Sequence, residues 1–377
     1  MDKVGVALIG SGFMGKCHAL AWNAVRPVFG ECPEIRLVHL AETTRELARE
    51  RADAFGFAKS TGDWSDVMAD PEVDVVSVTA PNPFHADMAV AALQAGKHVW
   101  CEKPMAPKLG DAIRMRGAAR TSGKAAILGY NYIQNPLIRQ ICQLLADGVI
   151  GEVNHVRVEM DEDFMADPSA FFSWRSDALS GYGALDDFSV HPLSLIRVLL
   201  GRVGSVMADM VKPYLERPLA AGGQGPVETY DIASVLFRLE SGASGVLMAN
   251  RSAWGRKGRI ALQIFGSKGS ILFDQERMNE IHVYRAGGTA ADAGYTTVLA
   301  GPAHAPYDKF IPAPGHGLGF NDLKVMECRQ LLSAIAGEDA YVIDFEKGVE
   351  IERTVHAMAQ SFMHRGWVDV DYGESSS

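Results

Sequence analysis

The stretch from Lys3 to Gly15 constrains the fold of this chain more than any other. Lys3–Ile9 is a short apolar run, typical of a strand buried on both faces, and it leads into a glycine-rich turn and then a helical pattern. In this context the glycines permit a tight turn, close approach of a pyrophosphate and close packing of helix on strand. The N–H groups at the helix start attract an anion. We therefore expect a dinucleotide-binding turn, the alternative being a turn without a ligand; its residues are Gly10, Gly12, Phe13, Met14 and Gly15.

The N-terminal third repeats this alternation of strands and helices. The apolar runs predict further strands at 35–41, 73–80, 98–101 and 124–130. Repeated strand–helix units predict a parallel, doubly wound sheet that binds its ligand outside the carboxyl ends of the strands. We expect the cofactor to lie against the residues that follow these strands, which are Glu42, Pro81, Asn82, His85, Glu102 and Lys103. Lys103, fixed between a strand and a proline, is expected to face the ligand; the alternative is a solvated surface charge.

Glu42 bears on which dinucleotide binds. An acidic residue at the end of the second strand can hydrogen-bond ribose hydroxyls and repel a 2′-phosphate, which favours NAD over NADP. Thr43 and Arg45 follow closely and could hold a 2′-phosphate, so NADP is not excluded. The spacing from the glycines exceeds the usual ~20 residues. We attribute the excess to a loop-like insert at Arg26–Pro33.

Length, composition and charge exclude several classes of protein. The chain has 377 residues, 47% of them hydrophobic and 22% charged, which indicates two or three ordered domains. The net charge of −10 disfavours nucleic acid and anionic membranes as partners. Five scattered cysteines without ligand spacing disfavour a disulfide framework and a zinc site, and suit a reducing cytoplasm. No apolar run approaches the ~20 residues of a membrane span. We expect no metal, and interpret Asp161–Asp163 near His155 as a solvated acidic loop.

A second candidate site lies near the middle of the chain, at Gly181–Ile196. Asp187 precedes His191 by four residues, which places both side chains on one face of a helix. Pro192 requires this helix to begin close to Asp187–Ser189, because proline is tolerated only in the first turn. A carboxylate beside a histidine can orient the ring for general-base chemistry. The alternative is a capping aspartate and a core histidine.

From Gly151 onward the pattern changes to short strands with turn signals between them. Seven strands are expected between residues 153 and 285, followed by two closing helices and a final strand, which predicts an α+β domain with one large open, mainly antiparallel sheet. One face of this sheet is expected to pack on the helix after Asp187. We expect the other face to be covered by a second subunit in a homodimer or homotetramer, through Ile232, Val235, Phe237, Val246, Leu262 and Ile264.

These features together resemble the glucose–fructose oxidoreductase / inositol dehydrogenase / MocA-like family over nearly the whole chain. The matching pieces are the Gly10–Gly15 turn, Pro81-Asn82 with His85, Glu102-Lys103-Pro104, Gly129-Tyr-Asn-Tyr and the Gly183…Asp187…His191 run. With Ser173-Trp174-Arg175 and the long loop after Val211, the pattern is most similar to the levoglucosan-type sugar and anhydrosugar dehydrogenases. Two departures bear on substrate identity: Ser194 stands where the family often has aspartate, and Gln134 where many members have arginine.

The resemblance implies a Rossmann domain at 1–130, a substrate-binding and oligomerisation domain at 131–377, and an oxidoreductase that transfers a hydride from a secondary alcohol of a sugar, anhydrosugar or cyclitol to NAD(P). It assigns catalysis to Lys103, Asp187 and His191. Substrate contacts are expected from these three and from Tyr130, Asn131, Trp174 and Arg175. Trp174 could offer a stacking face for the sugar and Arg175 a fork of donors, the alternative being a domain-interface pair.

Two other functions stay open. Some relatives use a tightly held NAD for transient oxidation within a lyase or glycosidase cycle. The fold also occurs in a non-catalytic regulatory protein, although the presence of Lys103 together with His191 argues against that function here.

Overall fold

The structure, a computed structural model, describes residues 2–373 and divides into two compact units. Unit 1 runs from the N-terminus to Gln134 and also takes Lys309–Pro312 and Leu318–Val349. Unit 2 holds Asn135–Asp308, Ala313–Gly317 and the chain from Glu350 onward. The segment Leu318–Val349 thus packs with the N-terminal part of the chain.

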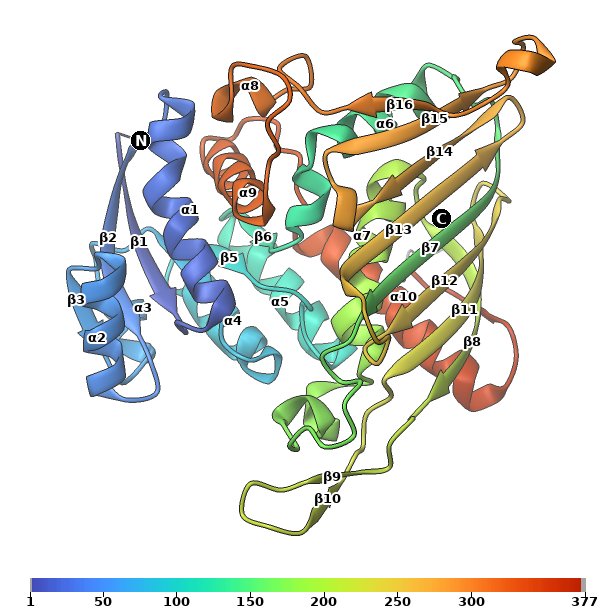
Figure 1. The fold of residues 1–377 in the computed structure, drawn as a ribbon. Helices are drawn as coiled ribbons and strands as arrows, with labels where there is room; N and C mark the ends of the chain where they lie inside the picture. Colours follow the sequence, from blue (N-terminus) through green and yellow to red (C-terminus); the bar gives the residue numbers. More distant parts are fainter. Residues whose placement is uncertain (1, 374–377) are drawn as a thin grey trace. The chain divides into compact units, whose positions relative to one another are not determined.

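Unit 1 is built on a parallel sheet with the strand order β3-β2-β1-β4-β5-β6 (Figure 1). Its strands are β1 (Lys3–Ile9), β2 (Glu34–Ala41), β3 (Lys59–Thr61), β4 (Val75–Val78), β5 (His98–Cys101) and β6 (Ala126–Leu128). Strands β4 and β5 are buried at every position, as expected for apolar strands covered on both faces. The strand order changes direction at β1, so the carboxyl ends of β1 and β4 flank the point where such sheets bind ligands. The predicted doubly wound sheet is confirmed.

Helices cover this sheet and complete the core of unit 1. They are α1 (Phe13–Phe29), α2 (Arg45–Phe55), α3 (Ser65–Ala69), α4 (His85–Gln94), α5 (Leu109–Ser122) and α9 (Phe320–Ile335). Helix α9 lies beside α1 (Figure 1), although some 290 residues separate them in the sequence (320 minus 29 is 291). Trp22 of α1, Trp100 of β5 and Leu331 of α9 belong to one buried hydrophobic cluster. This packing brings residues of α9 close to the ends of the strands.

The predicted loop at Arg26–Pro33 is wrong over its first half, because α1 continues to Phe29. Pro27 lies inside the last turn of this helix, where its missing N–H removes only one hydrogen bond near the helix end. Val25 is fully buried, and its packing holds this turn in place. The helix ends at Gly30, which has a φ of 73°.

Unit 2 is built on a large mixed sheet with the order β16-β15-β14-β13-β7-β12-β11-β8-β17. Its strands are β7 (Val153–Glu162), β8 (Val203–Val211), β11 (Ile232–Leu239), β12 (Ser244–Asn250), β13 (Lys257–Gly266), β14 (Gly269–Asp274), β15 (Glu280–Arg285), β16 (Thr296–Leu299) and β17 (Val368–Asp369). Within residues 2–373, β7 and β12 are the only parallel neighbours in this sheet. The large, mainly antiparallel sheet predicted from the sequence is confirmed. A short hairpin of β9 (Glu216–Pro218) and β10 (Gln224–Pro226) was not predicted.

The helical elements of the second half are α6 (Pro136–Ala146), α7 (Val190–Leu199), α8 (Tyr307–Phe310) and α10 (Phe345–His364). Helix α7 contacts β7 on one face of the sheet and is preceded by a π-helical turn at Leu185–Ser189. Leu193, Leu195 and Ile196 of α7 are buried against unit 2. Among residues 2–373, no helix is both long and apolar enough to cross a membrane.

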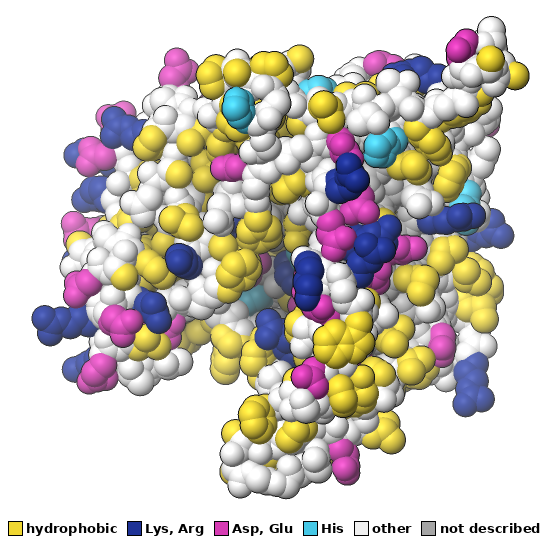
Figure 2. All heavy atoms as spheres, in the orientation of Figure 1, with side chains coloured by type: hydrophobic (Ala, Val, Ile, Leu, Met, Phe, Trp, Pro, Cys, Tyr) yellow, Lys and Arg dark blue, Asp and Glu magenta, His cyan; other side chains and the backbone are white. Residues whose placement is uncertain are grey.

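Most of the residues that were expected to face a second subunit point toward the core of unit 2 instead. Val235, Phe237, Leu262 and Ile264 are 0–1% exposed, so they belong to the core of unit 2. Because side chains alternate along a strand, the residues between them point outward instead. Leu236 is 47% exposed and pairs in register with Met207 on β8 and Val246 on β12. Figure 2 shows hydrophobic side chains mixed with charged ones on the visible face of the molecule.

Candidate active site

The glycine-rich turn between β1 and α1 is shaped to admit a ligand. Gly10 has a φ of 89°, which favours glycine, and a Cβ at Gly15 would collide with the carbonyl oxygen of Gly10. A Cβ at Gly12, in contrast, would meet no protein atom within 4 Å, so this position is open. Thr79, after β4, donates to the carbonyl of Gly10 at 2.7 Å and ties the turn to the neighbouring strand end.

Glu42, at the end of β2, lies against this turn. Its Oε1 accepts hydrogen bonds from the backbone N–H of Ser11 at 2.6 Å and from the Ser11 hydroxyl at 2.7 Å, and its Oε2 accepts from the N–H of Thr43 at 2.9 Å. Partial burial opposes ionisation of this carboxyl, but the hydrogen bonds from Ser11 and Thr43 outweigh it, and the pKa of Glu42 is lowered. A carboxylate is therefore held beside the glycine turn. Thr43 and Arg45, which could hold the 2′-phosphate of NADP, are exposed.

His85, predicted to bind the cofactor, is buried between two strand ends. Its Nδ1 lies 2.9 Å from the carbonyl oxygen of Pro104 and its Nε2 lies 2.8 Å from that of Ala80. Burial lowers the pKa of this ring. A neutral imidazole carries one N–H, so it donates to one of these carbonyls. The ring thus connects the segment after β4 to the Glu102-Lys103-Pro104 turn, which indicates a positioning role; Asn82 is buried beside it and Pro81 is exposed.

Glu102 belongs to a buried ionic network rather than to the surface of the turn. Its Oε1 lies 2.5 Å from Nζ of Lys324 and 3.0 Å from Nε2 of His18, and its Oε2 accepts from the N–H of Lys103 at 3.2 Å. Lys324 also contacts Glu327 at 2.8 Å, and Trp100 Nε1 donates to Glu327 at 3.2 Å. A Cβ at position 129 would collide with the carboxylate of Glu102, which explains why a glycine stands there.

Lys324 and Glu327, which lie on α9, were not predicted from the sequence. A lysine and a glutamate three residues apart in an amphipathic helix look like an ordinary surface pair. Both are nevertheless buried, at 0% and 2% exposure. Burial opposes ionisation of Glu102, but Lys324 and His18 outweigh it and lower the pKa of Glu102. Burial raises the pKa of Glu327 to about 7, because it outweighs the attraction of Lys324.

The second predicted cluster, in unit 2, is carried by one helical segment. Asp187 lies in the π-helical turn Leu185–Ser189 and His191 in the first turn of α7. The helix begins where the position of Pro192 predicts, but a turn of π-helix precedes it. His191 is 6% exposed, and Asp187 is 22% exposed in its side chain. Ser194, buried one turn later, donates to the backbone carbonyl of His191 at 2.7 Å.

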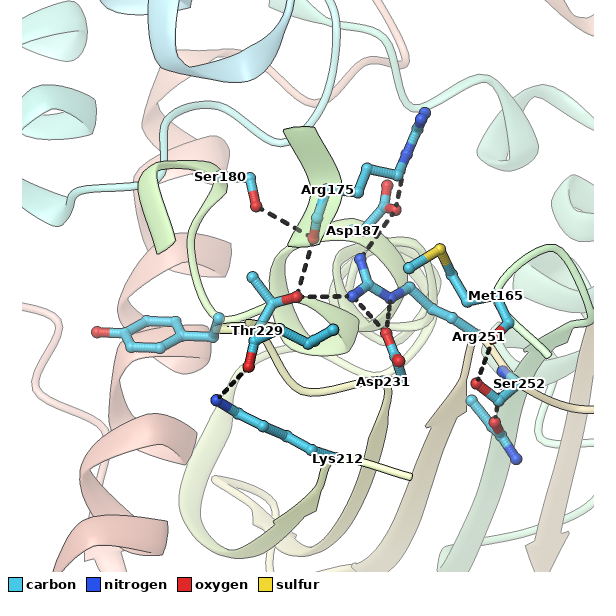
Figure 3. Close-up of polar contacts among 12 residues, drawn as sticks. Met165, Arg175, Ser180, Asp187, Lys212, Thr229, Asp231, Arg251 and Ser252 are labelled. Carbon is cyan, nitrogen blue, oxygen red and sulfur yellow. Dashed lines mark hydrogen bonds and ion pairs between the residues drawn. The ribbon is translucent and has the colours of Figure 1, made fainter. Parts of the chain in front are cut away.

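Asp187 lies between two arginines (Figure 3). Its Oδ2 is 3.6 Å from Nε of Arg175 and 3.7 Å from Nη1 of Arg251. Arg251 is buried and also pairs with the buried Asp231 at 2.6 Å. Arg175 was predicted from the sequence, but Arg251 and Asp231 were not, because they stand alone at strand ends and match no motif.

The remaining predicted substrate residues differ in exposure. Trp174 is 43% exposed, and the Arg175 guanidinium lies 4.5 Å from the centre of its ring. Tyr130 and Asn131 are almost fully buried. Gln134, which departs from the family pattern, is buried too and donates to the carbonyl of Tyr341 at 2.7 Å. His155 contacts Ser244 at 2.8 Å and Asp163 contacts Lys257 at 2.5 Å, so these two residues have separate partners.

The residues of unit 1 fit a dinucleotide. The first intrahelical hydrogen bond of α1 runs from Lys16 N to Gly12 O, so the amide N–H groups of the preceding turn lack helical acceptors. The first turn of α1 contains no acidic residue that would repel a pyrophosphate. With the open position at Gly12 and the carboxylate of Glu42, this arrangement provides both an anion site and a ribose acceptor.

Comparison with known proteins identifies the family. Residues 4–130 match the model of an oxidoreductase family with an NAD-binding Rossmann fold, and residues 138–272 match the GFO/IDH/MocA C-terminal domain. Levoglucosan dehydrogenase from Pseudarthrobacter phenanthrenivorans is 35% identical over 386 aligned positions, which cover 98% of this chain and 99% of that protein. This chain belongs to the Gfo/Idh/MocA family.

Two further comparisons place this Gfo/Idh/MocA protein among sugar and cyclitol dehydrogenases by sequence identity and by fold. A solved structure of levoglucosan dehydrogenase in complex with NADH and levoglucosan has a TM-score of 0.94 at 35% identity, covering 98% of this chain and 99% of that one. Inositol 2-dehydrogenase from Rhizobium meliloti is 29% identical and covers 77% of this chain and 79% of that protein. The Gfo/Idh/MocA protein described here is an NAD-dependent oxidoreductase, and NAD is its cofactor.

Proposed function

We propose that this oxidoreductase transfers a hydride from a secondary alcohol of a sugar, anhydrosugar or cyclitol to NAD, with levoglucosan as the first candidate substrate. The observation that carries the proposal is that the predicted oxygen donor and the predicted base both stand next to regular elements of the fold. Lys103 follows β5 in the nucleotide-binding unit, and Asp187 with His191 stands at the start of the core helix α7. The full-length similarity to a levoglucosan dehydrogenase supports the substrate class.

Each catalytic residue has a distinct task in this proposal. NAD, when bound, supplies the hydride acceptor. Gly10–Gly15 and Glu42 would hold it, with Pro81, Asn82, His85 and Glu102 shaping the turns around it. Lys103 would donate a hydrogen bond to the carbinol oxygen, which favours loss of its proton and stabilises charge in the transition state. His191 would accept that hydroxyl proton as a general base. The products are the ketone, NADH and one proton.

Asp187 and its neighbours would hold the sugar. Asp187 would orient His191 or accept a hydrogen bond from a neighbouring hydroxyl. Trp174 offers an exposed ring that can stack on the apolar face of a sugar, and Arg175, which lies over that ring, offers several N–H donors. Tyr130 and Asn131 stay predicted substrate contacts. Their burial in this structure supports a role in shaping the site more than direct contact.

The proposal is tested by recording NADH absorbance at 340 nm while the purified protein is mixed with NAD and one candidate at a time: levoglucosan, myo-inositol, glucose and xylose. We expect stoichiometric NADH formation with at least one of them. Consumption of a glycoside without net NADH would instead indicate a transient-oxidation cycle of the lyase or glycosidase type. Binding of NAD without turnover of any substrate would favour a regulatory protein.

We also propose that the chain forms a homodimer or homotetramer through the outer face of the large sheet. The supporting observation is the row of outward apolar side chains formed by Met207, Leu236 and Val246, with the exposed Met248 beside it. Light scattering at micromolar concentration should give a multiple of the 40.8 kDa chain mass, and Leu236→Lys should lower the measured mass. A monomeric mass for the unaltered chain would contradict the proposal.

The five free cysteines support a cytoplasmic location, which stays a proposal as well.

A further inference from the structure

Arg251 is a buried charge of unit 2 that lies beside the predicted catalytic carboxylate. It directly follows β12, is 1% exposed, and no sequence motif marks it. A buried arginine must satisfy a rigid fork of donors, so its partners define where its charge is placed.

Two of the three guanidinium nitrogens of Arg251 are fixed by buried groups (Figure 3). Nε and Nη2 donate to Oδ1 of Asp231 at 3.1 and 2.6 Å, and Nη2 also donates to the hydroxyl of Thr229 at 3.1 Å. Asp231 and Thr229 are both fully buried. The third nitrogen, Nη1, lies 3.7 Å from Oδ2 of Asp187. The buried pair therefore aims one nitrogen of Arg251 at the predicted catalytic carboxylate.

The backbone that carries Asp187 is docked on the same segment. Ala184 N donates to the carbonyl of Tyr230 at 2.7 Å, and Tyr230 N donates to the carbonyl of Tyr182 at 3.1 Å. Between them, Gly183 has a φ of 91°, and a Cβ there would collide with the backbone of Tyr230 and lie 3.0 Å from Nη2 of Arg251. The glycine thus lets the Asp187 turn pass directly over the arginine.

Arg175, the other arginine at Asp187, is arranged differently. Its side chain is 40% exposed, and its guanidinium lies over the rings of Trp174 and Phe164 at 4.5 and 5.6 Å from their centres. Its backbone carbonyl accepts from the hydroxyl of Thr229 at 2.8 Å. Of these two arginines, Arg175 is the partly exposed neighbour of Asp187, although its Nε is buried at the contact, and Arg251 is the fully buried neighbour.

We propose that Arg251 is a positioning residue that fixes the direction of the Asp187 carboxylate at the start of the α7 segment, while Arg175 is the more exposed of the two arginines at Asp187. The inference rests on the proposed function, in which Asp187 acts on the ring of His191 or on the substrate. Arg251 itself touches no substrate and acts only through Asp187.

The test is a double-mutant cycle between Arg251→Lys and Asp187→Asn, with kcat for sugar oxidation as the readout. Lysine keeps the charge but cannot hold Asp231 and Asp187 with one planar fork. We expect Arg251→Lys to lower kcat at least tenfold in the otherwise unaltered protein and less than twofold in the Asp187→Asn protein, with NAD binding within twofold in both. A purely structural role would lower kcat by the same factor in both backgrounds, which would overturn the proposal.

Arg217→Lys is the matched control. Arg217 is also fully buried and lies 3.9 Å from Asp231, but it donates to the carbonyls of Met165 and Asp167. We expect its replacement to lower kcat less than threefold and equally in both backgrounds. If Arg251→Lys does not fold, Arg251→Gln replaces it in the cycle, because it removes the charge that faces Asp187 and leaves Thr229 and its hydrogen bond to Arg175 unaltered. An Arg251→Gln effect that does not depend on Asp187 would then overturn the proposal.

A crystal structure separates this inference from the proposed function, since it needs no turnover. In the Arg251→Lys protein the Asp187 carboxylate should move by about 1 Å or more while the backbone of α7 stays in place, a displacement of the size that impairs catalysis. An unmoved carboxylate would overturn the positioning role even in an active enzyme. Absence of NADH formation by the unaltered protein would instead refute the proposed function alone.

Discussion

Each unit of the chain holds a buried cation between two carboxyl groups, but the two networks end in different places. In unit 1, Lys324 lies between Glu102 and Glu327, and all three are at most 4% exposed. In unit 2, Arg251 lies between the buried Asp231 and the partly exposed Asp187. The first network is closed to solvent. The second reaches a carboxylate that a ligand can approach.

The two networks support the predicted catalytic groups of their units in different ways. Glu102 precedes Lys103 in the chain and accepts its N–H, so the closed network holds the backbone from which Lys103 extends. A compact ammonium suits this role because it can serve several acceptors from the centre. In unit 2 the side chain of Asp187 is itself the supported group, and a planar guanidinium suits the fixed direction that this requires. Breaking each network should therefore produce different losses.

The largest expected effect is on stability. Lys324→Met leaves Glu102 buried without its cation, and we expect the free energy of unfolding to fall by about 3–5 kcal/mol, the usual cost of removing one partner of a buried pair. Urea unfolding followed by tryptophan fluorescence measures it. Arg114→Met, which removes the exposed pair with Asp87, should cost less than about 1 kcal/mol. Equal losses for the two variants would show that the buried network does not stabilise unit 1.

The next effect is on catalysis and compares the predicted oxygen donor of unit 1 with the predicted base of unit 2. Lys103→Met removes the donor to the carbinol oxygen but keeps the apolar stem, and His191→Ala removes the base. Each should lower kcat by roughly 10²-fold or more, which corresponds to about 2.7 kcal/mol, while NAD binding is retained. The two losses should be less than additive, and His191→Ala should flatten the acidic limb of the pH–rate profile. Turnover of the Lys103→Met protein within about threefold of the unaltered enzyme would refute the assigned role.

A smaller effect concerns a carboxylate of unit 1 that is held without a cation. Glu42 is fixed by Ser11 and Thr43, and its charge would oppose a 2′-phosphate on the ribose. We expect kcat/KM to favour NAD over NADP at least tenfold, about 1.4 kcal/mol, and Glu42→Gln to narrow this ratio. Steady-state kinetics with both cofactors provide the measurement. A tenfold preference for NADP would mean that Thr43 and Arg45 outweigh Glu42.

The smallest effect is a pH dependence of stability. Burial raises the pKa of Glu327 to about 7, above the ordinary value of 4.5, so the folded state keeps a proton that the unfolded state releases. The contribution of this group to stability is therefore present at low pH and falls as pH rises through this window. Relative to that of the unaltered protein, the free energy of unfolding of the Glu327→Gln protein should rise by about 1 kcal/mol or more from pH 5 to pH 7.5, as measured by urea unfolding.

The same measurement in unit 2 sharpens the comparison. Burial raises the pKa of Asp186, the neighbour of Asp187, to about 7 from 3.8. The free energy of unfolding of the Asp186→Asn protein, relative to that of the unaltered protein, should therefore also rise over the same pH range. A relative stability that does not change with pH in either variant would show that the buried carboxyl titrates near its ordinary value.

Much of the fold could be predicted because local patterns agree with it. The strand at Lys3–Ile9 and the strand at His98–Cys101 match their predicted bounds, since continuous apolar runs between turn residues have few other solutions. The helix through Pro27 and the inward direction of Val235 were predicted wrongly. Neither follows from a local pattern, because packing keeps α1 helical past a proline and strand register decides which face is covered.

The residues of the candidate site also divide into those that local sequence patterns predict and those that they do not. Gly10, Glu42, Lys103, Asp187 and His191 could be selected from the sequence, because motif spacing and strand ends identify groups that face a ligand. Lys324, Glu327, Arg251 and Asp231 could not be selected, because in the sequence each is an ordinary charged residue. Burial alone separates them from the surface charges.

Local sequence patterns were sufficient to predict most of the strands and helices, the glycine turn with its acidic partner, and the spacing of Asp187 and His191. These depend on backbone conformation and on residues close together in the chain, which short-range sterics and hydrogen bonding specify. The contact of Lys324 with Glu102 and the position of Arg251 beside Asp187 follow from the tertiary structure, over separations of 222 residues for the first pair and 64 for the second (251 minus 187). Packing brings these distant residues together and removes water from Lys324, Glu102 and Arg251, and a buried charge is stable only beside a counter-charge.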